Sequence, residues 1–148
     1  MTMPKRACRP VPLRLLRLVL NHQLWINSQG RFGNQLDRDE LLFENNDLEG
    51  VDFSRARLSD VFFKGGSLRG ARFVGAYLRY ATFVGCDLDG AEFADADLRD
   101  ATFSTNPEKA SFEHANLDRV AWGIEDVERR AVAFPNRPHV PVHLLRLE

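Results

Sequence analysis

The chain has 148 residues, of which 44% are hydrophobic and 28% charged, and its formal net charge at pH 7 is −1. This length and composition predict one small domain with a single core, and the near-neutral charge excludes a strongly basic nucleic-acid-binding protein or an acidic tail. The two cysteines, Cys8 and Cys86, lie far apart without metal-ligand spacing, so they predict neither a disulfide framework nor a metal site, and a reducing cytoplasm is the expected compartment.

Residues 1–40 are expected to form a basic tail, an amphipathic capping helix and an entry turn. Met1 to Leu36 contain six basic residues and no acidic residue. Pro12 suits the first turn of a helix over residues 12–27, and Gly30 is well placed to end it. One face of this helix is predicted to cover the end of the core with Leu13, Leu16, Leu20 and Leu24. Leu15, Val19 and Trp25 widen this face. No apolar run is long enough to span a bilayer.

An internal repeat of five residues dominates the middle of the chain. Large apolar residues recur at every fifth position from 43 to 103, and a small residue usually lies two positions earlier. Neither the helical period of 3.6 nor the strand period of 2 fits this spacing. The chain must turn a corner in each unit and point two side chains inward. The predicted core is Phe53, Leu58, Phe63, Leu68, Phe73, Leu78, Phe83, Leu88, Phe93, Leu98 and Phe103, followed by Phe112 and Leu117.

Units such as Ala71–Gly75, Ala91–Asp95 and Ala96–Asp100 carry a recognisable motif. They resemble the consensus A-(D/N)-(L/F)-x-x of the pentapeptide-repeat family, and the resemblance covers residues 41–124. It implies an all-β solenoid, a right-handed quadrilateral β-helix of about four coils with four units in each coil. It also implies a binding or scaffolding surface in place of an active site, with no cofactor.

A coil of twenty residues also places surface charges of opposite sign next to each other. Residues twenty apart should stack about 4.8 Å from each other, as neighbouring strands do. Asp52, Arg72 and Glu92 then form one column of alternating sign, and Glu49, Arg69 and Asp89 form a second. Opposite charges on adjacent strands are mildly stabilising, so these columns support the coil independently of the family resemblance.

The five-residue rhythm breaks once, because only nine residues separate Phe103 from Phe112. A deletion of one residue near Asn106–Pro107 returns Phe112, Leu117 and Trp122 to the walls of Phe53, Leu58 and Phe43. Pro107 and Glu108 then fall where a core leucine belongs, and this segment is expected to bulge outward because proline cannot donate to a ladder.

Residues 125–148 are expected to form a C-terminal cap and an extended tail. Ile124 to Ala133 could form a short closing helix, and the prolines that follow favour extended backbone. The last apolar stretch, Val142 to Leu147, either folds back onto the body or meets a partner, such as a second copy of the chain.

No catalytic, cofactor or metal site is predicted. Cys86 occupies an inward small position, and His22 is expected at the surface or in the packing of the cap. His139 and His143 are separated by Pro141 and do not share a helical face, so they are a poor candidate for a metal site.

Two surface features could bind a partner. An outward cluster of Phe62, Tyr77, Tyr80 and Val84 predicts a protein-binding surface, unless a terminal segment of the chain covers it. The acidic patch comprises Asp87, Asp89, Glu92, Asp95, Asp97 and Asp100. Some pentapeptide-repeat proteins mimic DNA and bind DNA gyrase, and the patch raises that possibility; the alternative is that each acid stacks near an arginine.

Three functions follow from these features. A protein-binding scaffold is favoured, because the sequence offers a rigid surface and no catalytic set. A topoisomerase-directed DNA mimic is the alternative, and direct binding of nucleic acid is not expected. A peripheral membrane module that uses the basic helix is the third, although a capping helix would need the same leucines.

Overall fold

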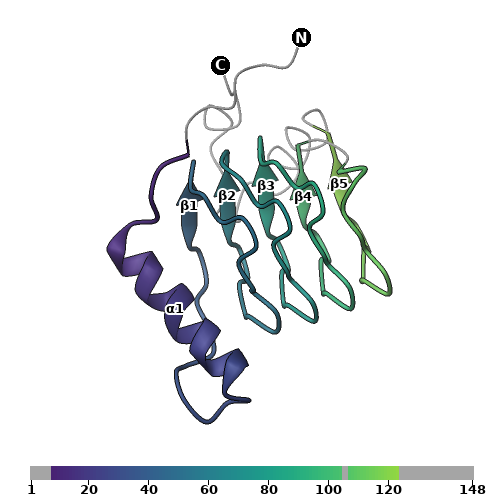
Figure 1. Cartoon of the computed structure of the whole chain (residues 1–148). Helices are drawn as coiled ribbons and strands as arrows, with labels where there is room; N and C mark the ends of the chain where they lie inside the picture. The colour runs from purple at the N-terminus through teal and green to yellow at the C-terminus, as the bar shows by residue number, and fades with distance from the viewer. Residues whose placement is uncertain (1–7, 105–106, 124–148) are drawn as a thin grey trace.

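The computed structural model describes residues 8–104 and 107–123. One α-helix, α1 (Leu13–Asn27), precedes five short strands that form one parallel sheet in the order β1-β2-β3-β4-β5. The strands are β1 (Leu42–Glu44), β2 (Phe62–Lys64), β3 (Thr82–Val84), β4 (Thr102–Phe103) and β5 (Ala121–Trp122). They lie in a row, each one coil further along the chain, with α1 beside the β1 end (Figure 1). The fold is a right-handed quadrilateral β-helix, as predicted.

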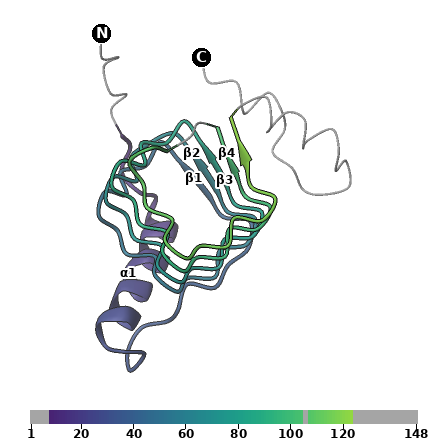
Figure 2. The same ribbon diagram turned by 90° about the vertical axis from the view of Figure 1, so that its right-hand side faces the viewer.

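The pairing register confirms the coil of twenty residues. Phe43 pairs with Phe63, which pairs in turn with Phe83. Isolated bridges repeat this offset on other walls, for example between Asp52 and Arg72. Viewed along the solenoid, the coils superpose as one four-sided outline (Figure 2).

The shortened last coil is also confirmed. Phe103 on β4 pairs with Trp122 on β5, an offset of nineteen residues. Glu92 bridges Ser111 with the same offset on the opposite wall. The chain therefore absorbs the missing residue locally, and the large residues return to their walls.

Two columns of aromatic rings fill much of the interior. Along one wall the rings of Phe73 and Phe93 stack with centroids 4.9 Å apart and planes 2° apart. Across the interior to the opposite wall, Phe63 meets Phe73 edge-on at 5.8 Å and 80°. Both arrangements are favourable for aromatic quadrupoles. Strict stacking at the strand spacing therefore adds directional ring contacts to the burial of apolar area.

The predicted core needs correction at its C-terminal end. The residues from Phe53 to Phe103 are buried, but Phe112 is half-buried and Leu117 is 37% exposed. Each inner coil is covered by a coil on both sides. Leu117 lies in the last described coil, so one side of its rung lacks that cover.

The corners of the coil use left-handed backbone. Tyr80, Asp100 and Arg119, one coil apart, all have φ between 56° and 60°. Gly66 is a special case with φ of 81°, because a Cβ there would collide with the backbone oxygen of Asn46 on the preceding coil. At this corner, glycine is required by both conformation and close approach.

The helix forms where the sequence predicts it, but only the Leu15 and Val19 side of the predicted apolar face packs. Leu15, Val19 and His22 are buried against the solenoid, whereas Leu13, Leu20 and Leu24 are 73%, 58% and 48% exposed. Hydrogen bonding explains which side of the helix packs. The end of the first coil presents a backbone carbonyl and a backbone N–H that His22 can satisfy and a leucine cannot.

The left-handed residue that ends the helix is Gln29, one residue before the predicted Gly30. Gln29 takes the left-handed position with φ of 57°. Its N–H donates to Ile26 O, and the Gly30 N–H donates to Trp25 O. These two bonds form a Schellman motif, which satisfies carbonyls at the helix end.

The solenoid begins at Leu36, five residues before the predicted start. Leu36 is 2% exposed, and its carbonyl accepts a hydrogen bond from the Arg57 N–H at 2.8 Å. The N-terminal arm adds a further rung, because Arg9 bridges Asn46 in parallel. Among the described residues, no helix has the length and hydropathy of a membrane span.

Candidate functional site

A group of tyrosines and an arginine, Tyr77, Arg79 and Tyr80, lies on the second coil. Tyr77 is 39% exposed, and Tyr80 is half-buried. The guanidinium of Arg79 lies 5.3 Å from the centre of the Tyr80 ring and donates to Tyr80 Oη at 3.3 Å. Cation–π contact and hydrogen bond together hold the two side chains in one geometry. The group therefore presents a pre-organised aromatic surface to solvent.

Arg79 is held from several sides and yet retains bonding capacity. Hydrogen bonding to Tyr77 is the main reason that the pKa of Arg79 is raised. Asp100 Oδ2 lies 3.9 Å from its Nη2. Its Nε is buried and has no hydrogen-bond acceptor among the described residues. A buried donor without an acceptor is unfavourable, so this part of the Arg79 contact costs stability.

The other two members of the predicted cluster are not exposed, which corrects the sequence prediction. Phe62 on β2 is 8% exposed, and Val84 on β3 is 0% exposed. Both lie on the outer side of the sheet, next to the inward Phe63 and Phe83. Removal of large apolar side chains from water is favourable, and these two are withdrawn from solvent although they lie outside the interior core. Only Tyr77 and Tyr80 remain as an accessible partner surface.

The acidic patch is interleaved with arginines. Arg69 Nη1 lies 3.3 Å from Asp87 and 3.4 Å from Asp89. Arg72 bonds Glu92 at 3.0 Å and lies 3.7 Å from Asp52 on the coil before it. The predicted column Asp52–Arg72–Glu92 is thus a ladder of ion pairs. Exposed pairs of this kind contribute little stability each, but they neutralise the surface.

The remaining acids follow the same pattern on the next wall. Arg99 binds Asp97 with two hydrogen bonds of 2.8 and 2.6 Å, which lower the pKa of the Asp97 carboxyl. Arg119 binds Asp100 through Nε at 2.8 Å. Asp95 alone of the six has no cation within ion-pair distance among the described residues. The six acids therefore do not make a continuous negative surface.

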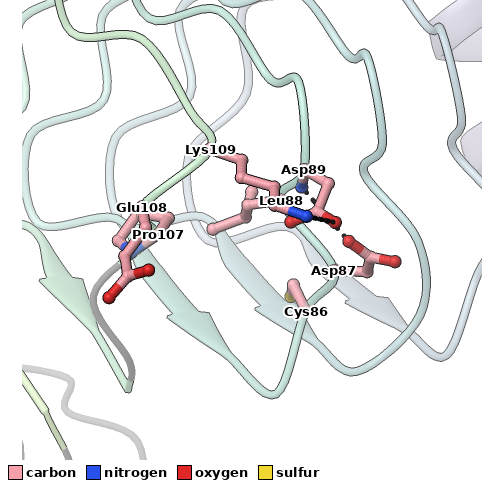
Figure 3. Close-up of a pocket in the computed structure, with 7 residues that line it drawn as sticks. All are labelled: Cys86, Asp87, Leu88, Asp89, Pro107, Glu108 and Lys109. Carbon is pink, nitrogen blue, oxygen red and sulfur yellow. Dashed lines mark hydrogen bonds and ion pairs between the residues drawn. The ribbon is translucent and has the colours of Figure 1, made fainter. Parts of the chain in front are cut away.

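A shallow pocket of about 240 Å³ opens where the rhythm breaks. It is lined by Cys86 to Asp89 on one coil and by Pro107 to Lys109 on the next (Figure 3). Here Pro107 and Glu108 replace the leucine that would stack on Leu88. Lys109 reaches back to Asp89, with Nζ 3.9 Å from Oδ2. The pocket is the gap left by the missing rung, partly closed by an ion pair.

Cys86 is the one nucleophilic side chain in this pocket. Its sulfur lies 3.2 Å from the Phe63 carbonyl oxygen and 3.4 Å from the Gly65 carbonyl oxygen, and its single S–H can donate to one of them at a time. Burial raises the pKa of Cys86 to about 12, so the thiol is protonated at neutral pH. The thiolate is the reactive form, so this residue is structural, as the sequence predicts. The described residues contain no group of three potential metal ligands.

His22 is a residue whose role the sequence left open. The N–H of Leu36 donates to Nδ1 at 2.9 Å, so Nε2 carries the proton and donates to the Ser54 carbonyl at 3.0 Å. Its ring stacks on Trp25. A signal was present: His22 is three residues after Val19 and seven after Leu15, a polar residue in an apolar helical stripe. Arg79 gave no such signal, because its neighbours depend on the coil. The predicted C-terminal helix, His139, His143 and the proposed self-association segment lie outside the described residues.

Comparison with known proteins agrees with the repeat. Residues 39–107 match the family model described as a pentapeptide repeat region. No curated protein matches the chain.

Solved structures of pentapeptide repeat proteins are also similar to the chain. A pentapeptide repeat protein of the Arabidopsis thaliana thylakoid lumen is 27% identical, and the alignment covers 57% of this chain and 63% of that one, with a TM-score of 0.28. HetL of the cyanobacterium Nostoc, which is involved in the regulation of heterocyst differentiation, is 17% identical over 60% of this chain and 54% of its own, with a TM-score of 0.30. Rfr23 of the cyanobacterium Cyanothece is 19% identical, with coverage of 63% and 68% and a TM-score of 0.29. The chain thus spans less than two thirds of the first two proteins.

Proposed function

Because the chain is a pentapeptide-repeat protein, we propose that it acts as a non-catalytic protein-binding module and that its partner docks on Tyr77, Arg79 and Tyr80. The observation that carries this proposal is the half-exposed, pre-organised tyrosine–arginine group on a rigid coil. Tyr and Arg are enriched among the residues that dominate protein interfaces. Little side-chain entropy is lost on binding when the donor geometry is already fixed.

Site-directed photo-crosslinking tests the proposed surface. A photoreactive residue at position 77 should trap a partner in cells, and the double variant Tyr77→Ser/Tyr80→Ser should lose that partner in affinity capture. Leu117→Ser is the matched control, since Leu117 is exposed to nearly the same degree on the last described coil. Loss in the tyrosine variant alone supports the surface. Equal capture by the wild type and both variants would show that the partner binds elsewhere.

The paired acids disfavour the DNA-mimicking alternative. A mimic of phosphates requires a connected negative surface, and five of the six acids lie beside an arginine. We therefore expect that the purified protein leaves DNA gyrase supercoiling unchanged. Inhibition that disappears when Asp87, Asp89, Glu92 and Asp95 are reversed in charge would instead favour the mimic.

A further inference from the structure

Helix α1 carries two apolar faces on opposite sides, and only one of them packs. Leu15, Val19 and His22 face the first coil. At about 100° per residue, positions 13, 20 and 24 fall within about 40° of one another and roughly opposite that buried face. We call Leu13, Leu20 and Leu24 the outer leucine stripe; their exposed fractions are 73%, 58% and 48%. Because α1 covers the end of the solenoid, the stripe faces away from the coils.

A further apolar side chain lies at the same end of the molecule. Phe32 is 65% exposed, in the turn that follows the helix. That turn folds back on α1, because the Asn34 N–H donates to the Asn21 carbonyl at 3.2 Å and Gly33 lies directly against the helix backbone beside Leu24. Phe32 therefore extends the apolar surface beyond the C-terminal part of the stripe.

The charged side chains of α1 are all positive. Helix α1 contains Arg14 and Arg17 and no acidic residue, and residues 1–36 contain six basic residues and no acid in a chain of net charge −1. By the helical period, Arg17 lies next to the stripe and Arg14 further round the same side. An occupant that contacts the leucines must accept these cations.

A second copy of the chain does not fit this requirement. A two-fold contact through the stripe pairs the helix with itself, so the arginines of both copies meet and α1 offers no acid to neutralise them. An anionic lipid surface fits. Apolar side chains enter the boundary between headgroups and acyl chains, while arginines remain among the phosphates. Stable membrane association takes two such signals, and both are present here.

We propose that α1 docks the solenoid on an anionic membrane surface, with the outer leucine stripe and Phe32 inserted and with Arg14 and Arg17 at the headgroups. The objection that a capping helix consumes its own leucines does not hold, because the cap uses Leu15, Val19 and His22. In this orientation the solenoid stands with its N-terminal end on the membrane, and the Tyr77 wall faces sideways. The proposal is independent of the protein-binding function.

Vesicle flotation with the full chain tests the proposal. We expect binding to vesicles of phosphatidylcholine with phosphatidylglycerol, much weaker binding to phosphatidylcholine alone, and loss of binding at high salt. Leu20→Gln/Leu24→Gln should lower the affinity at least about tenfold, because two inserted side chains are lost. Leu42→Gln, at a leucine of β1 that is 43% exposed, should bind like the wild type. Arg14→Gln/Arg17→Gln should weaken binding and flatten its salt dependence.

Circular dichroism melting serves as the folding control, and the substituted side chains are exposed, so all variants should melt near the wild type. The proposal is overturned if the folded wild type does not float with anionic vesicles, or if the leucine variant floats equally well. It is also overturned if light scattering finds a dimer that the leucine variant dissociates, since the stripe would then belong to a second copy.

Discussion

The imidazole of His22 ties the capping helix to the first coil through both ring nitrogens. Burial lowers its pKa below the ordinary 6.5, assisted by Arg55 and opposed by Asp52 and by the bond to Ser54. The folded state therefore favours the neutral ring, which is the form that accepts from the Leu36 N–H. The full contribution to stability is present above pH 6.5, and it declines as the pH falls below that value toward the lowered pKa of the folded state.

We expect the melting temperature to fall as the pH drops below about 6.5, in a window above that of Asp97, whose lowered carboxyl pKa matters only below about pH 4. His22→Ala should cost about 2–4 kcal/mol through two unpaired backbone groups and a cavity, and its melting curve should lose the slope in this window. Thermal melts of both proteins from pH 8 to 4.5 check this. An unchanged slope in the variant would assign the titration to another histidine.

A comparison of Gly66 with Gly70 distinguishes the conformational cost of a left-handed corner from the cost of steric overlap. Both have positive φ, but a Cβ at Gly66 collides with the Asn46 backbone, whereas a Cβ at Gly70 meets nothing within 4 Å. Gly70→Ala should cost about 1 kcal/mol from conformation alone. Gly66→Ala should cost about 3 kcal/mol or more, because strain and overlap add. Urea unfolding measures both, and equal losses would show that the coils separate easily at this corner.

At the scale of the element, the aromatic columns hold adjacent coils together. Phe73 is fully buried, stacked between Phe53 and Phe93 and met edge-on by Phe63 and Phe83. Phe73→Ala should lower the free energy of unfolding by about 3–5 kcal/mol through lost burial and a cavity. Phe73→Leu keeps most of the volume and should cost about 1–1.5 kcal/mol.

Denaturant unfolding of the two Phe73 variants makes this comparison. Leu117→Ala serves as the control and should cost less than either, because that rung is partly exposed. If Phe73→Leu were as damaging as Phe73→Ala, ring stacking would outweigh volume in this core.

Helix α1 shows what an element's sequence cannot decide. Its span is predictable from Pro12 and the leucine spacing, but two apolar faces compete for the solenoid. The choice depends on Leu36 N–H and Ser54 O, which are brought together only when the first coil closes. The sequence also left open whether Phe62 and Val84 are exposed or covered. Their positions on the outer face follow from the repeat, but what covers a face depends on the tertiary structure.

At the scale of the whole molecule, the repeat predicts most of the fold, because each coil contacts mainly its neighbours. The coil length, the aromatic walls, the charged columns and the nineteen-residue offset of β5 all follow from counting residues. Of the proposed binding surface, only Tyr77 and Tyr80 followed from the repeat. The contacts of Arg79 with the tyrosines and with Asp100, one coil further on, depend on side-chain geometry.

Removal of one complete coil should leave a folded protein. Deletion of residues 72–91 joins Ala71 to Glu92 and preserves every wall, so unfolding should stay cooperative with a smaller denaturant m-value. Deletion of residues 72–76 removes one unit and places every later phenylalanine over a leucine wall. We expect this second protein to be much less stable, as followed by circular dichroism in urea. Equal stability of the two deletions would mean that the alternation of Phe and Leu walls is irrelevant.

The hydrogen bonds between coils run along the solenoid, from each coil to the next, as from the Phe73 N–H to the Glu92 carbonyl and from the Tyr77 N–H to the Ala56 carbonyl. A mechanical load would therefore act very differently in two directions. Tension along the axis pulls directly on a few bonds of the terminal coil, so the chain should unwind one turn after another at low force. Tension across a coil is resisted by its neighbours in shear, with many bonds loaded at once. A protein with this construction is compliant end to end and stiff in cross-section.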